Sequence, residues 1–276
     1  LVIMPTSSKW QLMNININGS IFINCHFEDV GIITSGQFTN CIFTGSNLNI
    51  ASHSIISSGI IGGSSTLLTI SFGNECQVNN ARIRSVTVNP TDKLSLSSNE
   101  IKFSRFNKVD KVSGNMITNS RFLVEHVFVG NECTRVYLKN ANSSGFAGYS
   151  HNLTITGNQF SQVNNLSTTQ AIIEIDCFNN NTIPEIIIAH NTFETLASSQ
   201  RPIDLVNNRA SGAGIFMHIL IDGNMFFTYN NNIINYTASG RIRTIMSNNI
   251  STNNPSASWG LPSGVNNIIH TSNYIF

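Results

Sequence analysis

The sequence predicts an all-β solenoid, a parallel β-helix, and three observations point to this fold class. A short motif recurs, in which an apolar strand is followed by a small residue, an Asn, any residue and a large apolar residue. Apolar and polar residues alternate in the strands before it, and neither a long helical pattern nor a repeated hairpin signal is present. The intervals between the motif asparagines, 33, 33, 24 and 25 residues, are typical of stacked coils. These asparagines are Asn158, Asn191, Asn224, Asn248 and Asn273, and the apolar residues are Phe160, Phe193, Phe226, Ile250 and Ile275.

Each copy of the motif reads as a strand that ends at a corner. Leu153 and Ile155, like Ile186 and Ile188 one repeat later, fall on one face of a strand. The small residue and the Asn tolerate left-handed or turn backbone, and an Asn amide can bond to the Asn one coil away. A second set of strands is predicted between them, so we expect two strands per coil, with loops on the remaining side. This second set covers residues 136–138, 173–175, 203–205 and 234–236.

The front of the chain repeats in the same way. The segment FINCHF (Phe22 to Phe27) returns as FTNCIF (Phe38 to Phe43), and FGNEC, ending at Cys76, returns as VGNEC, ending at Cys133. We therefore expect one elongated β-helix domain over residues 1–276. Residues 1–20 are a candidate lead-in or cap, and residues 251–276 are a candidate last coil or subunit-packing segment.

Composition indicates a neutral, polar surface. Charged residues are 11% of the chain, against about 25% in average proteins, and there are 40 Asn. A net charge of +1 with scattered Lys and Arg argues against a nucleic-acid partner. No apolar run approaches the roughly 18 residues that a membrane helix needs, so no membrane insertion is expected. The histidines form no close metal-binding pattern, and we expect neither a metal nor another cofactor.

The cysteines indicate the environment in which the chain folds. Cys25 and Cys41 follow Asn in matching repeats, whereas Cys76 and Cys133 are predicted to stand where Phe stands in later repeats. Together with Cys177 they make an odd number without close pairs, unlike a disulfide scaffold or a zinc site. The first residues also lack the pattern of a signal peptide. We therefore expect folding in a reducing cytoplasm with free, buried thiols.

The repeated strand endings GNQF (Gly157 to Phe160), HNTF (His190 to Phe193) and GNMF (Gly223 to Phe226) carry a family resemblance. With the neutral, Asn-rich surface, they make the chain resemble the right-handed parallel β-helices of the pectin-lyase-like superfamily. That superfamily includes polysaccharide lyases and hydrolases, adhesins and bacteriophage tailspikes that bind or cleave bacterial surface polysaccharide. The free thiols favour the phage-like branch, whose members are commonly homotrimers. No catalytic motif of a single family is matched.

The strongest candidate for a catalytic site lies on the second set of strands. If Ile173 and Ile175 point into the core, Glu174 and Asp176 point outward, and Asp204 takes the place of Glu174 one coil later. Such carboxylates fall within the separations that retaining and inverting glycosidases use, so Glu174, Asp176 and Asp204 are the candidate catalytic residues. We expect Tyr137 and Lys139 in the same columns one coil earlier, as substrate-binding residues. Acids on the solvent face of strands are the ordinary case, and solvated or locally paired charges are the stronger explanation of these residues.

Three functions fit these residues. The first is a virion attachment protein, a homotrimer on the virion surface or outside the cell that binds a bacterial surface polysaccharide. The second is a hydrolase or lyase that degrades such a polysaccharide at the Glu174 patch. The third is a structural fibre or adhesin without catalysis, in which the coils act as a rigid spacer.

Overall fold

The computed structural model shows short strands, and no helix occurs among the residues it describes. In that part of the chain, nothing is helical, long and apolar enough to span a membrane. The described residues are 2–3, 9–11, 14–15, 19–29, 32–33, 35–63, 67–89, 93–140, 152–162, 171–176, 185–195, 201–206, 217–228, 233–236, 242–252, 259 and 268–275.

The chain divides into two compact units, residues 1–123 and residues 124–276, which are described separately. A single domain over the whole chain stays a prediction. The strands of the first unit are β1 (Val2–Ile3), β2 (Lys9–Gln11), β3 (Asn14–Ile15), β4 (Ser20–Ile23), β5 (His26–Glu28), β6 (Ile32–Ile33), β7 (Gly36–Thr39), β8 (Ile42–Thr44), β9 (Asn47–Ile50), β10 (Ile55–Ser57), β11 (Ile60–Gly62), β12 (Leu68–Phe72), β13 (Gln77–Asn79), β14 (Arg82–Arg84), β15 (Val86–Val88), β16 (Ser95–Ser97), β17 (Glu100–Lys102) and β18 (Arg105–Ser113).

Strand β19 (Met116–Val129) includes the boundary between the units. The strands of the second unit are β20 (Glu132–Asn140), β21 (Leu153–Thr156), β22 (Gln159–Gln162), β23 (Ile173–Asp176), β24 (Glu185–Ala189), β25 (Thr192–Thr195), β26 (Ile203–Val206), β27 (Met217–Asp222), β28 (Met225–Thr228), β29 (Ile234–Tyr236), β30 (Ile242–Ser247), β31 (Ile250–Thr252), β32 (Ile268–Thr271) and β33 (Tyr274–Ile275).

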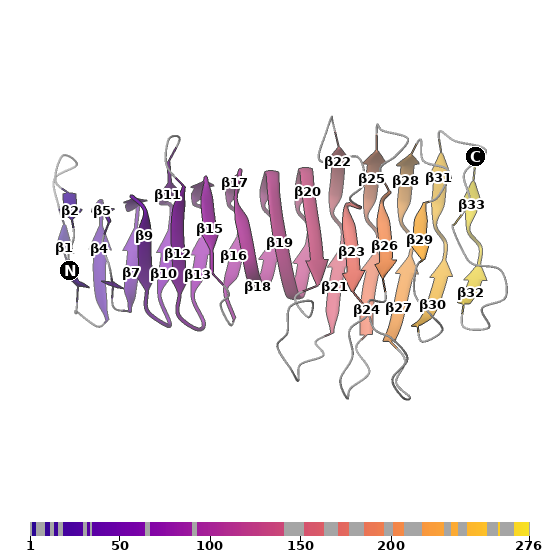
Figure 1. The fold of residues 1–276 in the computed structure, drawn as a ribbon, viewed down its shortest axis with the longest axis horizontal. Coiled ribbons are helices and arrows are strands. Elements are labelled where there is room, and N and C mark those ends of the chain that lie inside the picture. Colours follow the sequence, from indigo (N-terminus) through magenta and orange to yellow (C-terminus); the bar gives the residue numbers. More distant parts are fainter. Residues whose placement is uncertain are drawn as a thin grey trace. The chain divides into compact units, whose positions relative to one another are not determined.

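Successive coils pair in parallel, and each complete coil has three strands. In the second unit, β21, β24, β27 and β30 form one row, β22, β25, β28 and β31 a second, and β23, β26 and β29 a third (Figure 1). The expectation of two strands per coil was wrong, because the residues after the corner asparagine continue as a strand of their own. The fold is the right-handed parallel β-helix that the sequence predicts.

Stacked aromatic rings fill the core beside the corners. Phe160 and Phe193 lie 5.1 Å apart between ring centroids, Phe193 and Phe226 lie 4.9 Å apart, and the two rings of each pair are nearly parallel. All three rings are buried. In the first unit, Phe22 stacks on Phe38 and Phe27 stacks on Phe43. The predicted column of Phe160, Phe193 and Phe226 is therefore confirmed, and the first unit has stacked phenylalanines of its own.

The residue before each corner asparagine has left-handed backbone. Gly157, His190 and Gly223 have φ of 65°, 54° and 59°. This turns the chain so that the next side chain, the Asn, points inward. We call the stacked amides Asn131, Asn158, Asn191, Asn224, Asn249 and Asn273, of which all but the half-buried Asn273 are buried, the asparagine ladder.

Every step of the asparagine ladder repeats the same bonds. The backbone N–H and the side-chain amide of Asn158 both donate to Oδ1 of Asn191, at 3.0 and 2.9 Å. The side-chain amide also donates to the backbone carbonyl of Phe128, at 2.9 Å. Asn191 makes the equivalent bonds to Asn224 and to the carbonyl of Ile155. Each buried amide is thus satisfied by its neighbours one coil on either side.

The ladder runs through Asn249, and the prediction of Asn248 was wrong by one residue. Asn249 is fully buried and accepts from the amide of Asn224 at 2.9 Å. Asn248, with φ of 55°, takes the place of Gly223 at the corner. The strand after this corner is displaced by one residue in the same way, so Ser251 and not Ile250 lies beside Phe226. Trp259 packs edge-on against Phe226, with ring centroids 5.9 Å apart.

The cysteines occupy two kinds of position. Cys25 and Cys41 lie directly after left-handed corners and are buried. Cys133 lies beside Phe160, so its assignment to the phenylalanine column is confirmed. The same prediction for Cys76 was wrong, since it precedes Gln77, which aligns with Ile55 in another row. These four cysteines are buried and form no disulfide within the described part of the chain, and Cys177 lies outside it.

Substitutions in the adjacent pair Asn248 and Asn249 test the ladder. Asn249→Ala removes the bonds to Asn273 and to the carbonyl of Ile221 and leaves the amide of Asn224 without its acceptor. We expect a loss of at least about 2 kcal/mol in the free energy of unfolding, measured by denaturant titration. Asn248→Gly should change it by less than about 0.5 kcal/mol, because glycine adopts positive φ without strain. Equal losses in both variants would contradict this register.

Candidate functional site

The third row of strands in the second unit carries the candidate site. The carboxyl-terminal half of β20, then β23, β26 and β29 follow one another in parallel. In this register Lys139, Glu174, Asp204 and Asn235 occupy one column, one residue per coil. Their strand neighbours Ile173 and Ile175 are buried in the core. Because side chains alternate along a strand, the column lies on the opposite face.

Glu174 is held by two partners from β20. The Tyr137 hydroxyl donates to Oε2 of Glu174 at 2.8 Å, and the Lys139 ammonium donates to Oε1 at 2.5 Å. The side chains of Lys139 and Glu174 are only 17% and 22% exposed. A pair this sheltered is screened less by salt than an ion pair in open solvent. Glu174 is thus fixed in position by a charge-assisted bond and a phenol.

The expected alignment of β20 with β23 was wrong by two residues. Leu138 lies beside Ile173, and Lys139 lies beside Glu174. Tyr137 therefore reaches Glu174 diagonally instead of sharing its column. The shift escaped detection because Val136 and Leu138 are both apolar and both buried, so a displacement of two residues preserves the in-and-out pattern.

Asp204 aligns with Glu174 as predicted and is more sheltered than an acid on the outer face of a strand normally is. It lies beside Glu174 on the next coil and is 8% exposed. The Arg201 guanidinium lies 3.4 Å from its Oδ1. Burial raises the pKa of Asp204 above its ordinary value of 3.8, and the Glu174 charge adds to the rise, while Arg201 and a bond with Asn235 oppose it.

The third candidate acid, Asp176, is only partly placed. Its backbone lies in β23 beside Val206 of β26. Its side chain is outside the described residues, so its role as a catalytic residue stays a prediction. We call Tyr137, Lys139, Glu174, Arg201 and Asp204 the carboxylate cluster.

The carboxylate cluster offers several kinds of bond to a polar ligand. Carboxylate oxygens accept from hydroxyl groups, and the Arg, Lys and Tyr side chains donate. Of its two carboxyls, Asp204 retains a proton to higher pH than usual, whereas Glu174 is paired with a cation. Two carboxyls in unlike environments are the arrangement that acid–base chemistry at a glycosidic bond needs.

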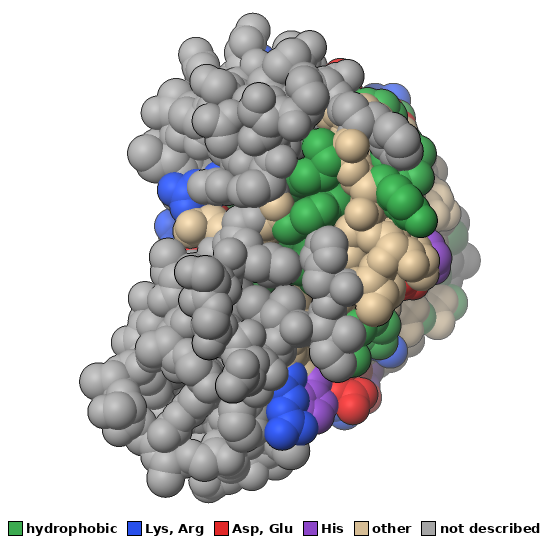
Figure 2. All heavy atoms as spheres, turned by 90° about the vertical axis from the view of Figure 1, so that its right-hand side faces the viewer, with side chains coloured by type: hydrophobic (Ala, Val, Ile, Leu, Met, Phe, Trp, Pro, Cys, Tyr) green, Lys and Arg blue, Asp and Glu red, His purple; other side chains and the backbone are tan. Residues whose placement is uncertain are grey.

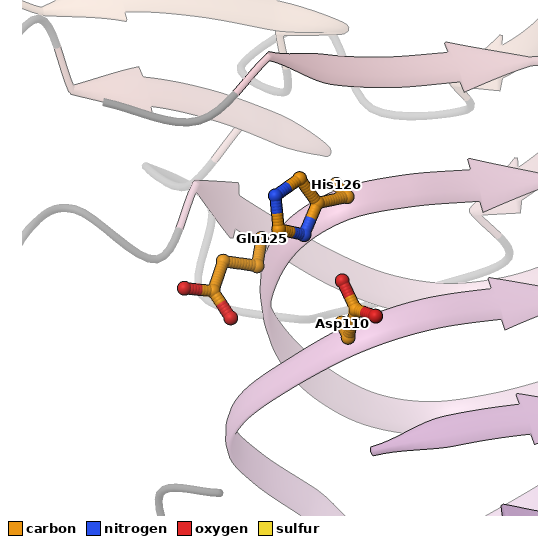
Figure 3. A group of neighbouring side chains, drawn as sticks. All are labelled: Asp110, Glu125 and His126. Carbon is orange, nitrogen blue, oxygen red and sulfur yellow. The ribbon is translucent and has the colours of Figure 1, made fainter. Parts of the chain in front are cut away.

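Three further titratable side chains were not singled out from the sequence. Asp110 belongs to β18, and Glu125 and His126 are consecutive residues of β19 (Figure 3). Asp110 and Glu125 are buried, and His126 is half-buried. Asp110 lies in the first unit and the other two lie in the second, so we assign no site to them.

Comparison with known proteins finds likeness in structure only. No protein-family profile matches the chain, and no curated protein matches it in sequence. Two of the similar solved structures are mutant tailspike proteins of E. coli bacteriophage HK620 in complex with a pentasaccharide. The chain is similar to these tailspikes.

The two tailspike structures resemble this chain to a similar degree. The first has a TM-score of 0.38 at 10% identity and covers 95% of this chain and 61% of the tailspike chain. The second has a TM-score of 0.33 at 10% identity and covers 99% and 71%. This chain therefore spans about three fifths of the length of the first tailspike. The fold assignment rests on the parallel strand register, which is independent of both.

The raised pKa of Asp204 predicts a pH effect on stability. Folding favours protonated Asp204, so its stabilising contribution is fully present below the ordinary pKa of 3.8 and is lost as pH rises through the folded pKa. Asp204→Asn cannot ionise. As pH rises from 3.8, the wild type should therefore lose unfolding free energy relative to Asp204→Asn.

The measurement is a series of denaturant titrations from acid to neutral pH. Arg201→Gln removes a cation that lowers the pKa of Asp204, so the loss of stability should extend to higher pH in that variant. A difference between wild type and Asp204→Asn that stays constant over this range would contradict the assigned burial.

Proposed function

We propose that the protein is a tailspike-like attachment protein of a virion and that the carboxylate cluster binds a host surface polysaccharide. The observation that carries this proposal is the fixed position of Glu174 between Tyr137 and Lys139 on the outer face of stacked strands. Sugar hydroxyls both donate and accept, and the cluster provides acceptors and donors in one place. Location on a virion and bacterial polysaccharide as the partner follow from the resemblance noted in the sequence.

Degradation of the polysaccharide is the second candidate. It is favoured by the unlike surroundings of Glu174 and Asp204, which lie on adjacent coils in the same column. In a hydrolase, Asp204 would donate its proton to the leaving oxygen, and Glu174 would act as the ionised partner. A fibre or adhesin without glycan binding is the remaining alternative.

Two variants separate these functions. The probes are purified bacterial lipopolysaccharides and capsular polysaccharides, assayed for binding, for new reducing ends and for unsaturated products. Tyr137→Ala removes an aromatic ring and one of the two bonds to Glu174, and we expect at least about tenfold weaker binding. Glu174→Gln should keep the fold and much of the binding but abolish any cleavage.

Leu67→Ala is the matched control, since Leu67 is 60% exposed, lies in the other unit and belongs to no proposed site. If the wild type binds a polysaccharide and releases no cleavage products, attachment without degradation is the function that remains. Cleavage that survives in Glu174→Gln would exclude this residue as catalytic. No binding by the wild type across the panel would favour the spacer and overturn the proposal.

The proposal includes assembly as a homotrimer. Exposed apolar side chains of the second unit support it, because Met225, Ile245 and Tyr274 are 40%, 44% and 54% exposed. Met225, Ile250 and Tyr274 form a column over three successive coils. Figure 2 shows hydrophobic side chains, in green, gathered in the right half of its view. Apolar surface of this kind is typical of subunit contacts.

Mass measurement by light scattering tests assembly. We expect three times the chain mass of 30.2 kDa at micromolar concentration. Ile245→Lys places a charge on the apolar surface and should shift the protein toward single chains while its strand signal in circular dichroism is unchanged. A single-chain mass for the wild type throughout the micromolar range would contradict the trimer.

A further inference from the structure

An exposed phenylalanine in the first unit has an unusual backbone. Phe103 directly follows β17, and its φ is 51°. Left-handed backbone is uncommon for a bulky residue, because its side chain crowds the chain. The same position in other coils of this unit is also left-handed, but it is taken by residues that tolerate such backbone, namely Asp29, Gly45, Ser85 and Asn119.

Burial of the Phe103 ring does not offset this backbone strain, because the residue is 52% exposed. Its neighbour is instead a cation. The Arg84 guanidinium carbon lies over the ring, 5.7 Å from the centroid. A residue kept in strained backbone without a role in the core points to a functional requirement. Here the feature that the ring supports is the position of Arg84.

Arg84 is exposed, and its guanidinium donates to no acceptor among the described residues, although its charge helps to lower the pKa of Glu100. The neighbouring charges are paired differently. Lys102 donates to Oε1 of Glu100 at 2.6 Å, and Arg82 lies 3.5 Å from Oε2 of the same carboxylate. Lys102 lies beside Arg84 in register. Its hydrogen bond is the main cause that lowers the pKa of Glu100.

The outer face of β14 and β17 therefore has an excess of positive charge. It carries the cations Arg82, Arg84 and Lys102 against the single acid Glu100, in a chain whose net charge is only +1. Exposed apolar side chains flank this face on the neighbouring coils, Ile60 on one side and Met116 on the other. An oriented guanidinium beside apolar surface matches a sugar that carries an oxyanion.

We propose that Arg84 binds the carboxylate or phosphate of an acidic glycan, and that Phe103 is the positioning residue that holds the guanidinium ready. The planar N–H fork of Arg84 donates two parallel bonds to the oxyanion, and Lys102 and Arg82 attract it. This site lies wholly in the first unit and uses none of the carboxylate cluster. It takes from the proposed function only the class of ligand, a surface glycan.

The test is calorimetric titration at low salt with trigalacturonate, galactose 6-phosphate and the neutral galactotriose. The wild type should bind at least one of the two anionic probes and bind galactotriose at least tenfold more weakly. Trigalacturonate binding identifies a carboxylate as the ligand group, and galactose 6-phosphate binding identifies a phosphate. Arg84→Gln should weaken the anionic probe by at least about tenfold.

Phe103→Asn separates positioning from structure. Asparagine tolerates positive φ, so the thermal midpoint should hold or rise while binding weakens severalfold. Arg121→Gln, which removes an exposed Arg of the same unit, is the control for net charge and should change binding by less than twofold. The proposal is overturned by equal losses in Arg84→Gln and Arg121→Gln, or by a wild type that binds neither anion at millimolar concentration.

Failure of this site and failure of the carboxylate cluster can be told apart. If Tyr137→Ala keeps full binding to the host polysaccharide while Arg84→Gln loses the anionic probe, the cluster fails and the Arg84 site stands. The reverse pair of results removes the Arg84 site alone.

Discussion

The fold depends on the left-handed corner followed by a buried asparagine. A strand that ends inside a solenoid must turn without leaving backbone groups unpaired in the core. Gly157 and its equivalents make the turn through positive φ, and the following Asn supplies both donors and an acceptor to the coils on either side. The asparagine ladder therefore sets the register of one coil on the next. Phe160, two residues later, is placed on Phe193 by the same alignment.

Coil length varies freely because the ladder fixes only one corner. Steps along it contain 27, 33, 33, 25 and 24 residues, yet the amide-to-amide bond is the same at every step. The differences are taken up away from this corner. The third row of strands, which precedes the next coil, still keeps Glu174 beside Asp204. A rigid scaffold with variable connections places polar side chains on a surface without disturbing the core.

Sequence reasoning succeeded where the same residues recur at a fixed spacing in successive coils. Asn158, Asn191 and Asn224 were found because each is followed two residues later by a phenylalanine. It failed at Asn248 and Asn249, because both residues suit a corner and only the stacked amide distinguishes them. It likewise misaligned β20, where apolar residues two positions apart are equivalent in pattern. The Tyr137 and Lys139 bonds to Glu174 depend on that register. Phe103 was missed because strain is a property of φ, which a sequence does not show.

Hydrogen exchange followed residue by residue on the native protein tests the central role of the asparagine ladder most directly. The backbone amides of Asn158, Asn191 and Asn224 donate to buried side-chain oxygens rather than to strand carbonyls. If the ladder holds the coils together, these amides exchange only through global unfolding and are as protected as the interior of β24. Exchange at rates typical of exposed corners, with the neighbouring strands still protected, would show that the strands hold the coils without it.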